Sequence, residues 1–319
     1  MTRKIRPKTQ CLTNQRYLWN NLIYSTSYFL NVINLKKSFI AKIEEKILKI
    51  VKLDFMDSKK AVDEFLAKKS ETPNKPVKSI FKSIDFNGMQ VFTYGNDKKS
   101  KNVILYVHGG AYVNEINIQH HLYCRKLSRK LNVNVLAPVY GLAPNHKVME
   151  SFDEITGLYK YLLEEYENTI LMGDSAGGGF VLSFVQYLKT VNLAQPQHII
   201  VFSPWVDISM SNTPYDSEND CILGEIGLKE IGKSWAGELD TQDYKVSPIF
   251  GDNSGLSRTL IFAGENEIFY KDIILYYDKL KNQNVDVKLL TGEGMFHIYP
   301  LFPSPEAREA FKEIKKEIK

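Results

Sequence analysis

The sequence predicts an α/β fold in which a mostly parallel central sheet is flanked by helices. Short apolar runs rich in β-branched and aromatic residues recur along the chain, each bounded by glycine-rich turns or by helical periodicity, and they lie at 102–107, 169–172, 199–202, 258–263 and 285–290. Runs of this length and composition are typical of buried strands. Their alternation with helices predicts parallel pairing, because parallel strands need a crossover between them.

The first 76 residues are expected to form a helical cap segment ahead of a core that spans 77–319. Basic residues precede an aromatic and aliphatic stretch at 17–39, and a second, amphipathic helix carries isoleucines and a valine on one face between 43 and 51. Asparagine and serine side chains interrupt 17–39 and no small-residue cleavage site follows, which argues against a signal peptide or a membrane-spanning helix. A helix lying on a membrane surface is the alternative for this stretch.

A glycine-rich loop, His-Gly-Gly-Ala at 108–111, follows the first apolar run of the core. Residues without bulky side chains leave backbone N–H groups free to point at one spot, which is how an oxyanion hole is built. A βα turn without chemistry is the alternative. The candidate oxyanion-hole residues are Gly109, Gly110 and Ala111, completed by Ala176, which follows the candidate nucleophile.

The pentapeptide Gly-Asp-Ser-Ala-Gly at 173–177 has the G-x-S-x-G form of a nucleophile elbow. A short apolar run at 169–172 precedes it, and apolar residues at helical spacing follow it as far as Leu188. Small residues are needed here because the turn is strained and the strand and helix backbones nearly touch. Ser175 is therefore the candidate nucleophile.

A serine hydroxyl near neutral pH needs a general base that is itself oriented by an acid. Of the six histidines, His297 alone lies on a loop after the last predicted strand, from which it can reach Ser175. Three carboxylates follow the preceding predicted strand, and Glu267 is favoured over Glu265 and Asp272. Asp272 resembles a residue in the first turn of the next helix, where a carboxylate complements the helix dipole.

A second cap segment is expected as an insertion at about 208–246. Its first part is rich in loop-forming residues, and 228–235 has helical character. Because it follows a core strand, we expect it to fold back towards the serine and to shape the substrate pocket together with the N-terminal helices.

Composition is that of one globular enzyme, with 319 residues, 44% hydrophobic and 24% charged. The formal net charge is +4, but the lysines are scattered, so no nucleic-acid partner is expected. Cys11, Cys124 and Cys221 are far apart and lack C-x-x-C spacing, which predicts neither a disulfide framework nor a zinc site and suits a cytoplasmic protein. The chemistry expected of the serine requires no metal or organic cofactor.

Taken in order, these motifs resemble the hormone-sensitive-lipase-like branch of the α/β-hydrolases, a group of bacterial carboxylesterases. The resemblance covers roughly 77–319, and the matching segments are 108–111, 140–144, 173–178, 203–207, 247–248 and 294–297. It implies an α/β-hydrolase fold with Ser175, Glu267 and His297 as a catalytic triad. The chain departs from the family pattern at Ala111, which replaces the third glycine of the loop, and at Glu267, where the family usually has aspartate.

The resemblance also implies a function, namely hydrolysis of small to medium acyl esters by a serine carboxylesterase with a lid over its acyl pocket. The same machinery can cleave amides, as in arylformamidases and small peptidases, and some members of this fold are ligand receptors without catalytic residues. The expected partner is a small-molecule ester. Membrane-surface contact is not favoured, and an exposed sheet edge leaves a homodimer open.

Overall fold

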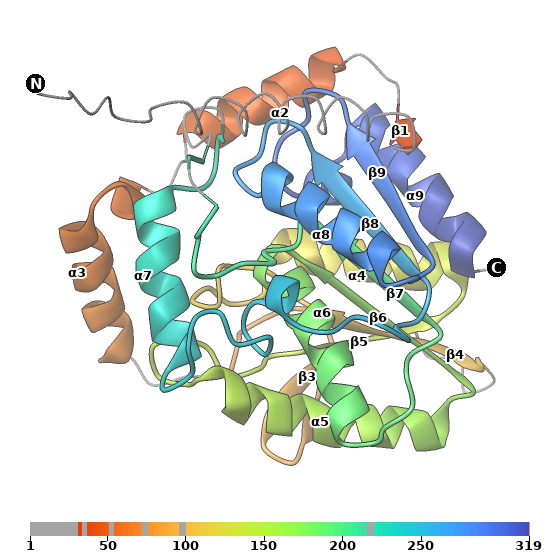
Figure 1. Ribbon diagram of the computed structural model, residues 1–319. Coiled ribbons are helices and arrows are strands. Elements are labelled where there is room, and N and C mark those ends of the chain that lie inside the picture. The colour runs from red at the N-terminus through yellow and green to blue at the C-terminus, as the bar shows by residue number, and fades with distance from the viewer. Residues whose placement is uncertain are drawn as a thin grey trace, which may run out of the picture. The chain divides into compact units, whose positions relative to one another are not determined.

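Nine strands within the described residues form one sheet, in the order β1-β9-β8-β7-β6-β4-β5-β3-β2 (Figure 1). The computed structural model describes residues 31–33, 37–50, 54–71, 76–95, 100–212, 214–215 and 220–318. The strands are β1 (Asn31–Ile33), β2 (Ser83–Phe86), β3 (Met89–Tyr94), β4 (Asn102–Val107), β5 (Asn134–Pro138), β6 (Asn168–Asp174), β7 (His198–Phe202), β8 (Thr259–Gly264) and β9 (Val287–Gly292).

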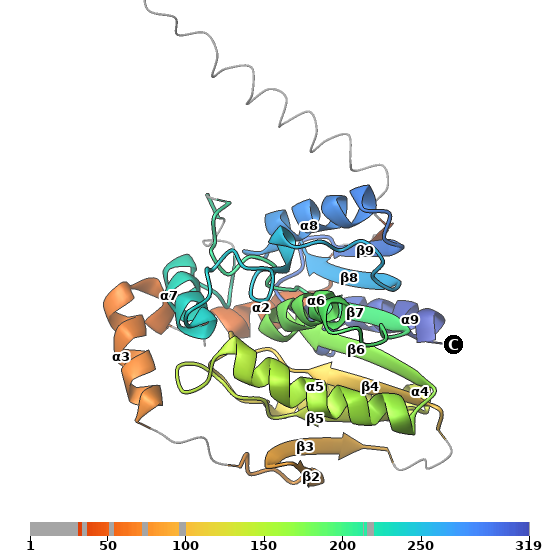
Figure 2. The same cartoon turned by 60° about the horizontal axis from the view of Figure 1, so that its bottom comes forward.

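Helices cover both faces of this sheet, with α5, α6 and α8 on one face and α4 and α9 on the other (Figures 1 and 2). The helices are α2 (Phe39–Ile50), α3 (Lys59–Ser70), α4 (Ile118–Leu131), α5 (Val148–Glu165), α6 (Ser175–Thr190), α7 (Glu225–Ala236), α8 (Tyr270–Asn282) and α9 (Pro305–Ile318). The part of the chain that the structure describes also contains the short 3₁₀ helices η2 (Asp54–Asp57), η3 (Pro248–Phe250) and η4 (Tyr299–Leu301).

The pairing of the strands confirms the predicted mostly parallel sheet. Within the described registers, β5, β4, β6, β7, β8 and β9 pair in parallel. At one edge β2 pairs antiparallel with β3, and β3 pairs antiparallel with β5. In β4 and β6 every side chain after the first is buried, and all of β8 is buried. Helices on both faces therefore explain why these strands are continuous apolar runs in the sequence.

The register brings the carboxyl ends of the central strands to one edge of the sheet. Val107 at the end of β4 lies opposite Gly173 in β6, and Asp174 lies opposite Phe202 at the end of β7. Gly264 and Gly292 likewise lie opposite each other at the ends of β8 and β9. The loops that follow β4, β6, β7, β8 and β9 consequently gather at this edge, where ligands bind in open α/β sheets.

The two predicted cap segments meet through α3 and α7, which lie side by side in both views (Figures 1 and 2). The turn η2 also contacts both helices, and a Cβ on Gly227 of α7 would lie 2.7 Å from Met56. The division into a cap at 1–76 and a core from residue 77, with a cap insertion at 208–246, stays a prediction. The stretch at 17–39 falls largely outside the described residues.

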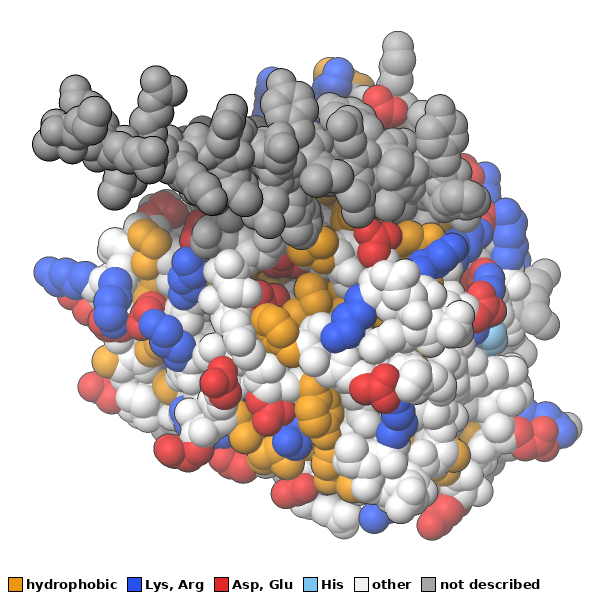
Figure 3. All heavy atoms as spheres, in the orientation of Figure 1, with side chains coloured by type: hydrophobic (Ala, Val, Ile, Leu, Met, Phe, Trp, Pro, Cys, Tyr) orange, Lys and Arg blue, Asp and Glu red, His pale blue; other side chains and the backbone are white. Residues whose placement is uncertain are grey.

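Charged side chains on the face shown in Figure 3 are interspersed, with cations and carboxylates side by side over the helices. This arrangement agrees with the scattered charges of the sequence. Across the described ranges, no helix combines the length and the apolar character needed to cross a membrane.

Candidate active site

Ser175 occupies a strained turn between β6 and α6. Its φ is +51°, a left-handed conformation that non-glycine residues rarely adopt. The backbones around it are in close contact, because a Cβ on Gly177 would lie 2.1 Å from the Val107 carbonyl oxygen. A Cβ on Gly173 would likewise lie 2.5 Å from the Gly177 carbonyl oxygen. The small residues on either side of the serine are therefore required by packing.

The structure brings the predicted residues Ser175, His297 and Glu267 together, with His297 between the other two. The His297 Nε2 atom is 2.8 Å from the Ser175 Oγ, a hydrogen-bonding distance. On the other side of the ring, His297 Nδ1 is 3.4 Å from Glu267 Oε2. All three side chains are buried, and they come from the loops after β6, β8 and β9. The hydroxyl, imidazole and carboxylate thus form a continuous line in the order that a serine nucleophile needs.

Burial and neighbouring charge shift the pKa values of His297 and Glu267 in opposite directions. Burial alone would lower the pKa of the His297 imidazole, but its contact with Glu267, together with the charges of Asp220 and Asp174, outweighs burial and raises the pKa. For Glu267, burial dominates and raises the pKa of the carboxyl despite its contacts with His297 and Ser203. At 3.4 Å the Glu267–His297 contact is an ion-pair distance rather than a short hydrogen bond.

Two residues that the sequence did not single out hold the acid in place. The Ser203 hydroxyl donates to Glu267 Oε2 at 2.6 Å and accepts from the Ile298 N–H at 2.9 Å. Asp220 accepts from the Ile268 N–H at 2.9 Å, next to Glu267 in the chain. Ser203 therefore links the acid to the residue after His297. Its position at the end of β7, in the segment 203–207, was the signal that could have identified it.

The competing carboxylates make other contacts. Asp272 accepts from the Tyr215 hydroxyl at 2.9 Å and from the Asn212 side chain at 3.0 Å, which ties α8 to the loop after β7. Glu265 accepts from the Gly294 N–H at 3.1 Å. Of the three carboxylates considered from the sequence, the structure brings Glu267 to the imidazole.

The loop after β4 approaches the serine through residues with unusual backbone conformations. Gly110, Ala111 and Tyr112 all have positive φ, at 124°, 54° and 60°. The Gly109 N–H donates to Asp174 Oδ1 at 3.1 Å, so this group is already engaged. No hydrogen bond within the described residues uses the N–H of Gly110 or Ala111, or that of Ala176. Three of the four candidate oxyanion-hole residues thus keep a donor available.

Asp174, the residue before the serine, connects the elbow to this loop. Besides Gly109, its carboxylate accepts from the Tyr106 hydroxyl at 2.7 Å and contacts His120 Nε2 at 3.2 Å. The Asn117 N–H donates to His120 Nδ1 at 3.1 Å, so the proton of the neutral ring lies on Nε2, facing Asp174. Burial alone would raise the pKa of Asp174, but the His120 and Tyr106 contacts lower it. The elbow and the oxyanion loop are therefore held together by a buried carboxylate.

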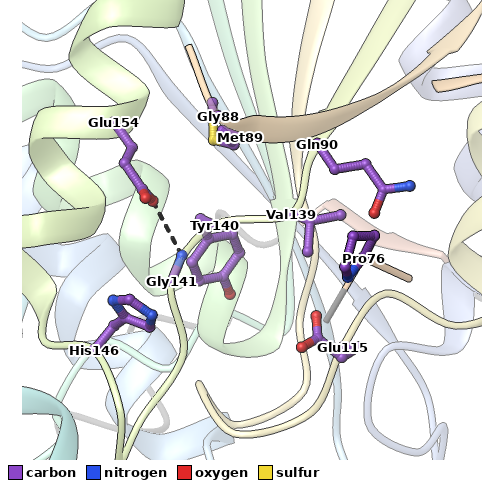
Figure 4. Close-up of a pocket in the computed structure, with 10 residues that line it drawn as sticks. All are labelled: Pro76, Gly88, Met89, Gln90, Glu115, Val139, Tyr140, Gly141, His146 and Glu154. Atoms are coloured by element: carbon purple, nitrogen blue, oxygen red, sulfur yellow. Dashed lines mark hydrogen bonds between the residues drawn. The ribbon is translucent and has the colours of Figure 1, made fainter. Parts of the chain in front are cut away.

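A separate pocket of about 240 Å³ lies beside the loop that follows β5 (Figure 4). Glu154 accepts from the Gly141 N–H in its wall at 3.1 Å, and the Tyr140 hydroxyl donates to the His108 carbonyl at 2.8 Å. The catalytic candidates do not line this pocket, and the Tyr140–His108 hydrogen bond ties its loop to the start of the oxyanion loop. Over the described ranges, no group of three or more His, Cys, Asp or Glu side chains is arranged to hold a metal ion.

Comparison with known proteins places most of this core in one family. Residues 104–301 match the family model described as alpha/beta hydrolase fold. An esterase of Acinetobacter venetianus is 28% identical over 220 residues, covering 66% of this chain and 73% of the relative. An acetyl-hydrolase of Streptomyces hygroscopicus is 24% identical over 216 residues, covering 66% and 72%. The solved structure of EstE7, a hormone-sensitive-lipase homologue from a metagenome library, has a TM-score of 0.73 at 23% identity, covering 89% of this chain and 98% of EstE7.

Proposed function

The chain belongs to the alpha/beta hydrolase fold family, and from this premise we propose that it is a serine carboxylesterase that hydrolyses small to medium acyl esters. The observation that carries the proposal is the 2.8 Å distance from His297 Nε2 to Ser175 Oγ, with Glu267 on the opposite side of the ring. The names of the relatives, an esterase and an acetyl-hydrolase, support ester hydrolysis in particular.

In the first half of the reaction, Ser175 Oγ attacks the ester carbonyl carbon while its proton passes to His297 Nε2. The imidazolium that forms faces Glu267, whose charge stabilises it. Collapse of the tetrahedral intermediate breaks the bond to the alcohol oxygen, which takes the proton from His297 and leaves. The acyl group then remains on Ser175 as an ester.

In the second half, water attacks the acyl-enzyme and His297 takes the proton of that water. The second intermediate collapses to release the acid, and Ser175 recovers its proton from the imidazolium. Each intermediate carries a negative oxygen, which the N–H groups of Gly110, Ala111 and Ala176 would bind. One such donor is worth about 10²–10³ in kcat because it is oriented before charge develops.

Large aromatic side chains border the reaction centre and support an acyl group of limited size. The backbone N–H of Trp205 donates to the Ser175 carbonyl at 3.0 Å. The Tyr112 ring stacks on Trp235 with centroids 4.4 Å apart and lies 5.7 Å from the Trp205 ring. These rings are fully buried, and the Trp205 ring also stacks on Phe269 at 5.6 Å, which in turn lies 5.4 Å from the His297 ring. Close-packed side chains of this kind do not yield easily to a long acyl chain.

The direct test compares turnover of p-nitrophenyl acetate and butyrate in the wild-type protein and in Ser175→Ala. We expect Ser175→Ala to lose at least about 10³-fold in kcat, since the remaining site can bind ester but cannot form the acyl-enzyme. Ser183→Ala is the matched control, because Ser183 is buried in the same helix and its hydroxyl has no partner within the described residues. Faster cleavage of the corresponding p-nitroanilide would favour an amide hydrolase, and no turnover of any activated ester would favour a ligand receptor.

A further inference from the structure

Helix α2 turns an apolar stripe towards solvent. Ile40, Ile43, Ile47 and Ile50 follow one another at spacings of three or four residues and therefore share one face of the helix. Their exposed fractions are 44%, 43%, 55% and 83%, and Phe39 at the start of the helix is 77% exposed. Contiguous exposed apolar surface of this kind marks an interaction site in a natural protein.

Cations border this stripe, and the carboxylates of the helix face elsewhere. Lys42 and Lys46 are exposed, and no carboxylate in the described part of the chain pairs with either of them. Glu45 is turned to Lys37, which it meets at 2.7 Å. The Glu44 carboxyl oxygens are buried, and burial, with the nearby charge of Glu306, raises the pKa of that group to about 7. The outward face of α2 thus combines aliphatic side chains with positive charge.

The stripe is fixed to the rest of the fold next to the candidate active site. The Ser38 N–H and hydroxyl, just before α2, donate to the two Glu306 carboxylate oxygens at 2.6 and 3.0 Å, which anchors α2 to α9. The Lys37 ammonium group lies 5.9 Å from the centroid of the Phe296 ring, and Phe296 precedes His297. A surface that bound the α2 stripe would therefore lie close to the loop that carries the general base.

We propose that the exposed face of α2 binds an anionic lipid bilayer surface, with its isoleucines in the headgroup region and Lys42 and Lys46 against lipid phosphates. Amphipathic helices bind membranes in this way, through buried apolar area plus attraction to anionic lipids. Single-stranded nucleic acid is a poorer match, because it needs stacking aromatics among the cations, and Phe39 is the only aromatic residue in α2. A second copy pairing through the same face would bring like charges together across a two-fold axis.

Co-sedimentation of the full chain with vesicles tests this surface. Vesicles of phosphatidylcholine containing phosphatidylglycerol should bind the protein, and pure phosphatidylcholine vesicles should bind it more weakly. Lys42→Gln/Lys46→Gln should lower the affinity for anionic vesicles about tenfold or more, since each cation near such a surface contributes about fivefold. Ile43→Ser/Ile47→Ser should lower it at least about tenfold at unchanged charge.

Arg125→Gln/Arg129→Gln, on the exposed side of α4, is the matched control because it removes the same charge from another helix. Loss of vesicle binding in this control alone would move the lipid surface to α4 and overturn the proposal. Unchanged vesicle binding in both α2 variants would overturn it as well. A lower melting temperature of Ile43→Ser/Ile47→Ser would also overturn the proposal, because it would mean that the stripe packs inside the protein. The same holds if sedimentation velocity shows that the wild-type protein is a dimer and that this variant is a monomer. None of these readouts depends on ester turnover.

Discussion

Replacement of Glu267 by glutamine would test how the proposed acid acts on His297. The substitution keeps the size of a buried side chain, and the glutamine carbonyl oxygen can still accept the hydrogen bond from Ser203. It removes the negative charge that lies 3.4 Å from His297 Nδ1. The imidazolium formed during attack by Ser175 would then be buried without its counter-ion.

The loss follows from what that charge does in the transition state. Removing the acid of a serine triad while keeping its shape lowers kcat by up to about 10⁴. Because Glu267 contacts His297 at an ion-pair distance and not through a short hydrogen bond, we expect kcat to fall about 10²–10⁴-fold in Glu267→Gln. This corresponds to about 3 to 5 kcal/mol of transition-state stabilisation.

The pH profile gives a second readout of the same substitution. His297 must be neutral to accept the serine proton, so activity rises as pH increases through its pKa. The Glu267 contact raises that pKa in the wild-type protein. Without the charge, burial lowers the pKa of His297, and the acid limb of kcat/KM should move to lower pH in Glu267→Gln.

Asp272→Asn is the matched control, because Asp272 is also buried and follows the same strand but contacts Tyr215 and Asn212. We expect its kcat for p-nitrophenyl butyrate to stay within about threefold of wild type, with the acid limb unmoved. A larger fall in kcat for Asp272→Asn than for Glu267→Gln would refute the assignment of the acid. Far-UV circular dichroism and melting temperature would show whether either variant is misfolded.

Three further outcomes follow from individual contacts. Ser203→Ala should lower kcat about tenfold and lower the free energy of unfolding in urea by about 1–3 kcal/mol, because it leaves Glu267 with one fewer buried hydrogen bond. An unchanged kcat would show that Ser203 does not position the acid. Gly177→Ala should yield little folded protein, since the new Cβ would lie 2.1 Å from the Val107 carbonyl oxygen, and a wild-type melting temperature would contradict the close packing. Burial raises the pKa of Asp272 from 3.8 to about 6, so the folded state binds more protons than the unfolded state between these values. Asp272 should therefore make the free energy of unfolding fall on the order of 3 kcal/mol as pH rises through this window. In urea titrations at pH 4 and 7, the fall should be smaller by about this amount in Asp272→Asn than in the wild-type protein.

The parts of the site that are local in sequence could be predicted from it. Ser175 lies in a turn whose glycines, preceding strand and following helix are all neighbours along the chain. The parallel sheet then fixes where the loops after β8 and β9 must lie, which is why His297 could be identified by its order alone. The α/β-hydrolase family that the sequence resembles is confirmed by the family match.

Contacts between distant segments could not be predicted in this way. Ser203 is 64 residues from Glu267, and Asp220 is 48 residues from Ile268, so neither pairing leaves a local pattern. The Gly109 N–H looked available in the sequence, but the Asp174 carboxylate, 65 residues away, accepts its hydrogen bond. Side chains that hold a site in shape depend on how the loops pack, and composition and spacing carry little information on that packing.

The central claim is that the Ser175 hydroxyl is the nucleophile and His297 its base. The most direct measurement is the mass of the protein after treatment with a p-nitrophenyl phosphonate, followed by peptide mapping. The account predicts one phosphonyl group per chain, on the peptide that contains Ser175, and a much slower reaction in His297→Ala. Labelling of another residue, or an equal rate in His297→Ala, would contradict it.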